Sequence, residues 1–330
     1  MIVTPKTLEL IFSKEIPIFD FNKRERYKKK KMSKILVIGS SNTDMVIKTE
    51  KLPAPGETIL GGTFLMNPGG KGANQAVAAA RLGAKVTFIT KRGNDLFGNQ
   101  AVDLLMREGI DTQYIVKDIE FPSGVALITV DSAGENSIVV APGSNGNLLQ
   151  EDIPLVIFET GKFEILLLQL EVPISTVEYA AVTASEHNIK VILNPAPAFK
   201  LSDNLLKHTW LITPNENEAE TITGVAIIDL PSAERAAVLF QERGVKNVII
   251  TLGEKGAFVK SVDYTGLIPG IKVSPVDTTA AGDVFNGALA VAISEGKNLK
   301  DAVLFANKAA SISVTRMGAQ ASAPYRNEIK

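Results

Sequence analysis

The sequence DTTAAGDVFNGALAVAIS starts at Asp277 and places a second acid, Asp283, in the first turn of a predicted apolar helix. Ala280, Ala281 and Gly282 are small, so they leave the first amides of that helix uncovered at the positive end of its dipole. Such amides can hold a transferring phosphoryl group, and a carboxylate beside them is economically explained as a general base for a substrate hydroxyl. The alternative interpretation is that Asp283 only caps the helix and complements its dipole.

A second glycine-rich segment, NPGGKGANQAVAAA at residues 67–80, has the same pattern. Its glycines let the backbone approach a ligand, although G-G-x-G alone is also common in ordinary tight turns. Polar residues also follow predicted strands elsewhere in the chain, which is where open α/β sheets bind ligands. Amide and carboxylate groups in these positions suit a polyhydroxyl ligand such as a sugar. The candidates are Lys71, Asn74 and Gln75 in the glycine-rich segment, and Asn42, Asp44, Glu171 and Asn215 after the strands.

Apolar strand patterns alternate with helical patterns along most of the chain. KILVIGS at 34–40 is a continuous apolar run typical of a strand buried on both faces, and GANQAVAAARLGA at 72–84 has helical spacing that ends near a glycine. The alternation continues as far as NVIITLG at 247–253. It predicts an α/β fold with a mainly parallel, doubly wound sheet and helices on both faces.

Two stretches interrupt this alternation. Residues 45–66 and 122–141 have hairpin-like strand patterns with turns at PAPG and SAGE. Strands inserted into an α/β domain predict a small separate β-sheet, which we expect to act as a lid or a dimerisation surface.

Composition limits the classes of function. The chain has no cysteine, so disulfides and thiolate chemistry are excluded, which suits a reducing cytoplasm. Residues 1–31 carry nine basic and four acidic residues, and we expect them to form a basic, disordered extension. The remainder has a net charge of −6 and no general attraction for nucleic acid. We therefore expect no nucleic-acid partner, and we expect no membrane span because no run of 18 apolar residues occurs.

Neither the dinucleotide fingerprint nor the Walker loop is present, since VIGSSN follows the first strand. Six other motifs resemble the ribokinase family of carbohydrate kinases, of the phosphofructokinase B type. They occur in order over about residues 34–327, and the domain that the resemblance implies spans residues 32–330. The motifs are GSSNTD (39–44), GGKGANQA (69–76), NPAPA (194–198), TPNENEA (213–219), TLGEKG (251–256) and DTTAAGDVFNGAL (277–289).

The resemblance implies ATP-dependent phosphorylation of D-ribose at O5, giving D-ribose 5-phosphate. Asp283 would deprotonate the 5-hydroxyl, and the amides of Ala280, Ala281, Gly282 and Asp283 would form the anion hole for the γ-phosphoryl group. The sugar hydroxyls would be bound by Asn42, Asp44, Gly70, Lys71, Asn74, Glu171 and Asp283.

The resemblance also implies binding sites for ATP, Mg²⁺ and a monovalent cation, usually K⁺. Asn215 and Glu218 match a motif that helps to arrange magnesium and phosphate, although Glu218 is also compatible with a simple first-turn acid. The implied ATP-binding residues are Asn215, Thr251, Leu252, Gly253, Glu254, Lys255, Gly256, Gly282 and Asn307. The implied K⁺ residues are Asp277, Thr279, Ser313, Arg316 through its carbonyl, Gly318 and Ser322.

Several alternatives remain open. A related kinase would act on deoxyribose or a nucleoside, and a non-catalytic sugar sensor would keep the pocket without turnover. A sensor has no need of the base at Asp283, which argues against that reading. A nucleic-acid-binding role would use the basic residues 23–31. The lid strands further imply a homodimer, since in relatives the lid strands of two subunits pack together.

Overall fold

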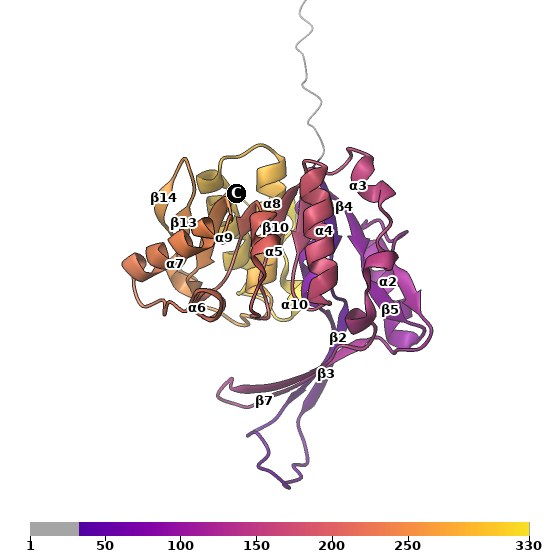
Figure 1. The fold of residues 1–330 in the computed structure, drawn as a ribbon. Helices are drawn as coiled ribbons and strands as arrows, with labels where there is room; N and C mark the ends of the chain where they lie inside the picture. Colours follow the sequence, from indigo (N-terminus) through magenta and orange to yellow (C-terminus); the bar gives the residue numbers. More distant parts are fainter. Residues whose placement is uncertain (1–32, 330) are drawn as a thin grey trace, which may run out of the picture. The chain divides into compact units, whose positions relative to one another are not determined.

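The structure is a computed structural model that describes residues 33–329 (Figure 1). The predicted basic extension, residues 1–31, lies outside the described residues. Within the described part no helix is long and apolar enough to cross a membrane.

The central sheet has eight strands, and those from β4 to β12 in spatial order run parallel. An antiparallel pair, β13 and β14, extends the sheet at one edge. The predicted fold class is therefore confirmed. In spatial order the strands are β14 (Thr265–Pro269), β13 (Gly256–Lys260), β12 (Asn247–Thr251), β11 (Leu211–Ile212), β10 (Lys190–Leu193), β9 (Ile165–Leu168), β1 (Lys34–Ile38) and β4 (Lys85–Ile89).

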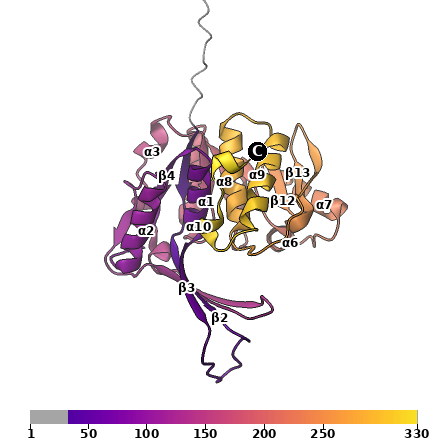
Figure 2. The ribbon, with the colours of Figure 1, turned by 180° about the vertical axis from the view of Figure 1, so that it is seen from behind.

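Helices cover both faces of this sheet. Ile35 and Val37 of β1 pack into the apolar cluster that contains α1, α8 and α9, while Leu36 and Ile38 pack into the cluster that contains α4, α5 and α7. Figures 1 and 2 show these two helical layers from opposite sides. Because successive strand residues point to opposite faces, burial of both faces explains the continuous apolar run of β1. The helices are α1 (Lys71–Arg81), α2 (Leu96–Arg107), α3 (Val156–Glu159), α4 (Ile174–Glu186), α5 (Asp203–Lys207), α6 (Glu216–Thr223), α7 (Leu230–Glu242), α8 (Ala281–Ser294), α9 (Leu299–Ser313) and α10 (Ala319–Ser322).

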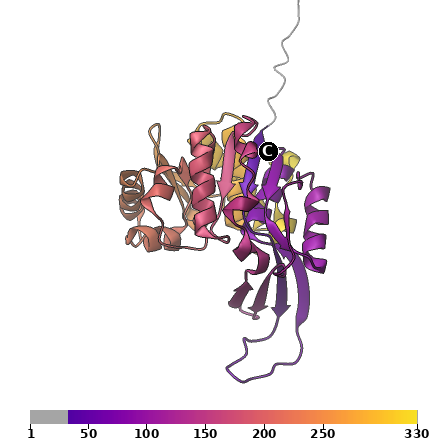
Figure 3. The ribbon, with the colours of Figure 1, turned by 45° about the vertical axis from the view of Figure 1, so that its right-hand side comes forward.

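A separate four-stranded sheet projects from the carboxyl end of β1 (Figure 3). Its strands overlap the two stretches that interrupt the alternating pattern, but the first begins at residue 42 and the second ends at residue 69, beyond the predicted bounds of 45 and 66. Residues 49–62 lie outside any strand. A further short parallel pair is formed by β5 (Lys91–Gly93) and β6 (Val116–Asp118). In spatial order the strands of the four-stranded sheet, which we call the lid, are β3 (Thr63–Gly69), β2 (Asn42–Lys48), β7 (Gly124–Val130) and β8 (Asn136–Ala141).

Candidate active site

The amino end of α8 carries Asp283, which is only 6% exposed. The preceding residue of the helix mouth, Ala280, has a left-handed backbone (φ 60°) and provides no side-chain cap. The amide of Ala281 donates to the Thr278 carbonyl at 3.2 Å. The amides of Gly282 and Asp283 have no acceptor in the described part of the chain, so they are the first-turn donors available to an anion. The expectation that Ala281 contributes an equivalent free amide is therefore not met in this structure.

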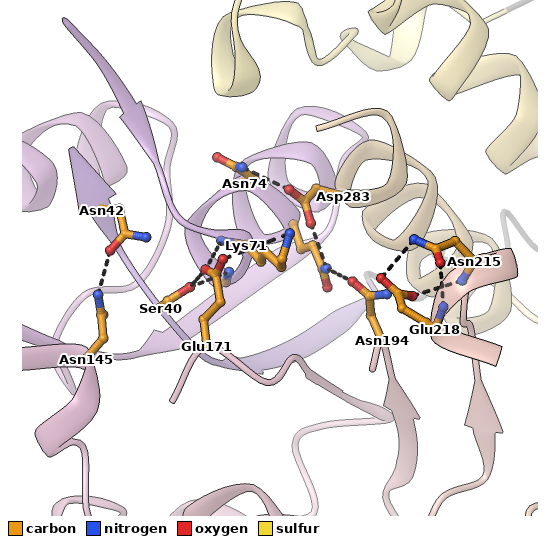
Figure 4. A network of polar contacts seen from close by, with 12 residues as sticks. Ser40, Asn42, Lys71, Asn74, Asn145, Glu171, Asn194, Asn215, Glu218 and Asp283 are labelled. Carbon is orange, nitrogen blue, oxygen red and sulfur yellow. Dashed lines mark hydrogen bonds and ion pairs between the residues drawn. The ribbon is translucent and has the colours of Figure 1, made fainter. Parts of the chain in front are cut away.

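Two amide side chains of α1 hold the Asp283 carboxylate (Figure 4). Asn74 Nδ2 donates to Oδ2 at 2.9 Å, and Gln75 Nε2 donates to Oδ1 at 3.0 Å. These contacts require close packing of α1 on α8, which Gly287 permits. A Cβ at Gly287 would lie 2.7 Å from the Ala78 side chain, too close for any other residue without a shift of the helices.

Burial raises the pKa of Asp283 above its usual value, while Lys71 and the donated hydrogen bonds from Gln75 and Asn74 oppose that rise. Glu171 adds to it by charge repulsion. A raised pKa makes the ionised carboxylate a stronger proton acceptor, as a general base requires. The electrostatics of the site therefore agree with the first interpretation of Asp283 from the sequence.

Glu171, which follows β9, anchors the start of α1. Its Oε2 accepts hydrogen bonds from Ser40 Oγ at 2.5 Å and from the Lys71 amide at 3.0 Å (Figure 4). The Lys71 ammonium lies 3.9 Å from Glu171 Oε1. Burial alone would lower the pKa of Lys71, but the carboxylates of Asp283, Glu171, Glu218 and Asp44 outweigh it and raise that pKa. Lys71 is thus the cation among the acidic groups of this site.

The backbone at Gly70 places α1 against the start of the lid. Gly70 has φ 88°, and a Cβ there would lie 2.7 Å from the Asn42 amide nitrogen, so the position requires glycine. Asn42, the first residue of β2, accepts a hydrogen bond from Asn145 Nδ2 at 2.7 Å. Asn42, Asp44, Gly70, Lys71, Asn74 and Glu171 therefore gather where β1, β2, β9 and α1 meet, as the sequence predicted.

The ionised form of Asp44 is electrostatically unfavourable in the folded protein without ligands. Burial, with repulsion from Glu171 and Asp283, raises its pKa to about 6, although Lys71 opposes the rise. The folded state therefore favours protonated Asp44, and the stability that this group gives at low pH is lost as the pH rises from about 4 to 6. We expect Asp44→Asn to raise the unfolding free energy at pH 7 by about 1 kcal/mol, allowing for solvent screening at this partly exposed group. Denaturant unfolding at pH 4, 5, 6 and 7 measures the effect.

The gain from Asp44→Asn should be close to zero at pH 4 and should grow toward pH 7. The same variant should bind sugar poorly, because it loses a carboxylate acceptor in the site. Asp103→Asn, on the exposed surface of α2, is the matched control. A gain that is the same at every pH, or a loss of stability at pH 7, would contradict the burial argument for Asp44.

Two adjoining cavities open beside Asp283. One of about 210 Å³ is lined by Lys71, Ala280, Gly282 and Asp283, among others. The other, of about 360 Å³, runs past Thr251, Gly253, Gly256 and Asn307. The two cavities share four lining residues, so the smaller space continues into the larger one. The shared residues are Asn215, Thr251, Ala281 and Gly282.

Not every predicted nucleotide residue faces the larger cavity. Leu252 is 6% exposed and packs in the apolar cluster under α4 and α7, because it directly follows the buried strand β12. Glu254 and Lys255 are exposed, and neither lines the cavity. Asn307 does line it, and its Nδ2 also donates to the Pro269 carbonyl at 3.1 Å. The residues of this loop that line the larger cavity are therefore Thr251, Gly253 and Gly256.

Asn215 and Glu218 form a capping box at the start of α6. Asn215 Oδ1 accepts from the Glu218 amide at 2.8 Å, and the Glu218 carboxylate accepts from the Asn215 amide and Nδ2 at 2.9 and 3.0 Å (Figure 4). The structural role that the sequence left open for Glu218 is thus present. Burial also raises the pKa of Glu218, and Asp283 adds to the rise, so its carboxylate lies within the electrostatic field of the site.

The six residues expected around a monovalent cation lie in two segments that are bonded together. Asp277 Oδ1 accepts from the Thr279 amide at 2.9 Å, and Oδ2 accepts from the Gly318 amide at 2.8 Å. The Arg316 guanidinium pairs with Glu328, so this side chain is engaged elsewhere while its backbone remains near Asp277. Ser313 and Ser322 are buried at the ends of α9 and α10. The oxygen-rich set fits a large hard cation.

Several buried side chains in the site were not predicted to be functional. Gln169, Asn194, Thr213 and Asn286 continue the hydrogen-bond network away from Asp283, and Asn145 supports Asn42. Asn194 lies in the quoted NPAPA motif, but nothing in periodicity or composition indicates the partners of these side chains. Asn286 lies one turn after Asp283 on the same helix, whereas Gln169, Asn194 and Thr213 lie far from Asp283 in sequence and Asn145 lies far from Asn42. Those four reach the site only through the fold.

Residues 32–326 match the pfkB family of carbohydrate kinases, and the chain belongs to that family. It is 47% identical to the ribokinase of Haemophilus influenzae over 294 residues, which cover 89% of this chain and 96% of the relative. It is 38% identical to the deoxyribokinase of Salmonella typhi over 291 residues, which cover 88% and 95% of the two chains. The solved structure of Arabidopsis thaliana ribokinase complexed with ribose and ATP is 32% identical, with a TM-score of 0.83 over 90% of this chain and 97% of that one.

Proposed function

We propose that this chain is an ATP-dependent kinase that phosphorylates D-ribose at O5. The observation that carries the proposal is the position of Asp283. Its carboxylate lies between the polar residues that suit a sugar and the cavity in front of the free amides of α8. A base and an anion site at one helix mouth are the two elements that phosphoryl transfer to an alcohol requires. The names of the relatives at 47% and 32% identity, both ribokinases, support ribose as the acceptor.

In the proposed reaction the sugar lies against Asn42, Asp44, Lys71 and Glu171, and its 5-hydroxyl points to Asp283. Asp283 accepts the hydroxyl proton as the oxygen attacks the γ-phosphorus of ATP. The bond from that phosphorus to the β–γ bridging oxygen breaks and ADP leaves, while the amides of Gly282 and Asp283 stabilise the charge on the transferred group. The smaller cavity would hold the γ-phosphoryl group and the larger one the rest of the nucleotide. Catalysis would come mostly from positioning and electrostatic stabilisation.

Two cations belong to the proposal. Magnesium usually keeps several waters and binds ATP phosphates with few protein ligands, so Glu218, with both oxygens engaged by Asn215, would act on it through water. Potassium would be held by the Asp277 and Ser313 segments and would help to order the anion hole beside it. We also place the enzyme in the cytoplasm, where ATP is supplied and a cysteine-free chain is at no disadvantage.

Coupled ADP release with Mg-ATP and K⁺ tests the proposal. The acceptors to compare are D-ribose, 2-deoxyribose, fructose, adenosine and none. We expect ribose to give the highest kcat/KM. Turnover only with another acceptor would keep the kinase but replace its substrate, and no turnover with any acceptor would favour a sugar sensor.

A deoxyribose kinase is the second candidate, because a deoxyribokinase is 38% identical over most of the chain. The two sugars differ by one hydroxyl. A site built to bond that hydroxyl leaves buried polar groups unpaired when it is missing, which can strongly favour ribose. The ratio of kcat/KM for the two sugars decides between the candidates.

We further propose a homodimer formed through the lid. The strand register places Asp44 on one face of the lid and Ile47, Phe64, Leu127 and Val139 on the other. These four apolar side chains are between 43% and 65% exposed. A large exposed apolar surface on a folded chain is typical of an interaction site.

We expect light scattering to give twice the chain mass for the wild-type protein and the single-chain mass for Val139→Asp, since a buried unpaired charge is costly. Asn136→Asp, on the opposite face of the same strand, is the control and should remain a dimer. A wild-type monomer would contradict the lid dimer, and so would a Val139→Asp variant that remains a dimer.

A further inference from the structure

Gln75 is fully buried directly behind the catalytic carboxylate. Its Nε2 donates to Asp283 Oδ1 and to Asn194 Oδ1, each at 3.0 Å, and its Oε1 accepts from Gln169 Nε2 at 2.6 Å. Gln75 lines neither of the two cavities beside Asp283. It therefore reaches the cavities only through the side chains that it bonds, Asp283 and Asn194, which both line the smaller one.

The direction of the Gln75 amide is set by its neighbours. Asn194 Nδ2 donates to the Thr213 carbonyl at 3.2 Å, which turns Asn194 Oδ1 toward Gln75. An ionised Asp283 offers only acceptors. Two acceptors at one end of Gln75 require its NH₂ group there, so its oxygen must face Gln169. A flipped Gln75 would place oxygen against oxygen on both of these contacts.

Gln169 is the next member of the chain and is also fully buried. Its Nε2 bonds Gln75, while its Oε1 has no hydrogen-bond partner among the described residues. A Cβ at Gly39 would lie 2.1 Å from that oxygen, so Gly39 provides the room that Gln169 occupies. An unpaired buried carbonyl lowers the stability of a fold by about 1–3 kcal/mol. The Gln169 side chain nevertheless keeps the orientation in which its NH₂ group donates to Gln75. A flipped Gln169 would turn its oxygen to Gln75 Oε1 and lose the bond.

We propose that Gln169 and Gln75 are positioning residues, a one-directional amide relay that holds the plane of the Asp283 carboxylate toward the acceptor hydroxyl. Asn74 fixes the other carboxylate oxygen, Oδ2. Gln75 fixes Oδ1 from the protein side, and Gln169 acts only by fixing Gln75. The inference rests on the proposed kinase function with Asp283 as its base.

A double-mutant cycle in kcat tests the relay. Gln75→Met should lower kcat by about 10–100-fold, because one hydrogen bond to a charged group is lost. Gln169→Met should lower it by about 3–10-fold, since Gln75 keeps its bond to Asp283 but loses its orientation. The double variant should be no slower than Gln75→Met alone, and the ribose KM should stay within about twofold in all three. Gln241→Met, on the exposed side of α7, is the control for the chemical change.

A role in packing alone would give a different pattern. Two independent packing defects would have additive effects on the activation free energy, so the fold-losses in kcat of the two single variants would multiply in the double variant. That result would overturn the relay, and so would a wild-type kcat in Gln75→Met. Gln75→Glu has the same shape and replaces the donor by an acceptor, so it keeps the test valid if Gln75→Met does not fold. We expect it to lower kcat more than Gln75→Met.

The pH profile gives an independent readout. The charged groups facing Asp283 are Lys71 on α1, Glu171 after β9, Glu218 on α6 and Asp44 on β2, and none is changed by these variants. Loss of the Gln75 donor should move the acid limb of kcat to higher pH, since that donor favours the ionised carboxylate. An unmoved limb would contradict the relay.

The relay and the proposed function fail in different ways. Full activity of Asp283→Asn, or no ribose phosphorylation by the wild-type enzyme, would refute the proposed function itself. Loss of activity in Asp283→Asn together with wild-type behaviour of Gln75→Met would refute the relay alone.

Discussion

Replacing Asp283 with asparagine is expected to lower kcat for ribose by about 10²–10⁴-fold while changing the ribose KM much less. Asparagine keeps the shape of the side chain and removes its ability to accept the hydroxyl proton. The polar groups around the sugar remain in place, so ground-state binding loses little. Steady-state kinetics with Mg-ATP at fixed K⁺ measure both parameters, and a thermal melt establishes that the variant is folded.

Asp301→Asn is the matched control for the capping interpretation of Asp283. Asp301 is also an acid in the first turn of a long helix, α9, but it is exposed and lines neither of the two cavities. A cap or dipole effect is worth about 0.3–1 kcal/mol of stability and should appear in both variants. Near-normal turnover in Asp283→Asn would rule out its role as the base.

Replacing Gly282 with alanine is expected to lower kcat by about 10²-fold without destabilising the fold. A Cβ at Gly282 would meet no atom within 4 Å, and alanine is favoured over glycine inside a helix by up to about 1 kcal/mol. The added methyl group would instead project from a residue that lines both cavities and carries one of the two free amides. It should hinder the approach of the phosphoryl group to those donors.

Gly146→Ala is the control for Gly282→Ala. The nearest atom to a Cβ at Gly146 is 3.6 Å away, which is ordinary contact, and the residue lies outside both cavities. We expect the melting temperature of Gly282→Ala to equal or exceed that of the wild type. Wild-type kcat in this variant would show that the transferred group does not use the mouth of α8.

The alternating apolar patterns were sufficient to predict the sheet and its two helical layers, because burial on both faces leaves a continuous apolar run such as that of β1. The motif at the mouth of α8 placed Asp283 in the first turn of the helix, but the segment alone left open whether this residue is a base or only a cap. Which amides are free could be seen only in the structure, because the Ala281 amide bonds the Thr278 carbonyl. That bond accompanies a left-handed backbone at Ala280, a conformation that alanine rarely adopts and that the sequence therefore does not predict.

The support of the base was not predictable from the chain alone. Gln75 precedes Asp283 by 208 positions and Gln169 follows Gln75 by 94, and no local pattern relates residues so far apart. Leu252 shows that a motif does not fix the direction of each of its side chains. It lies inside a loop motif of nucleotide-binding type, yet its apolar side chain turns into the core, since burial outweighs its place in the motif.

The measurement that tests the central claim most directly is the identification of the product formed from Mg-ATP and D-ribose. ³¹P NMR of the reaction, with the phosphorus coupled to the sugar protons, identifies the carbon of the sugar that carries the phosphoryl group. The account predicts a phosphomonoester on C5, formed by the wild-type enzyme and nearly absent with Asp283→Asn. A phosphate on another carbon, or a C5 phosphate formed equally fast without the Asp283 carboxylate, would contradict it.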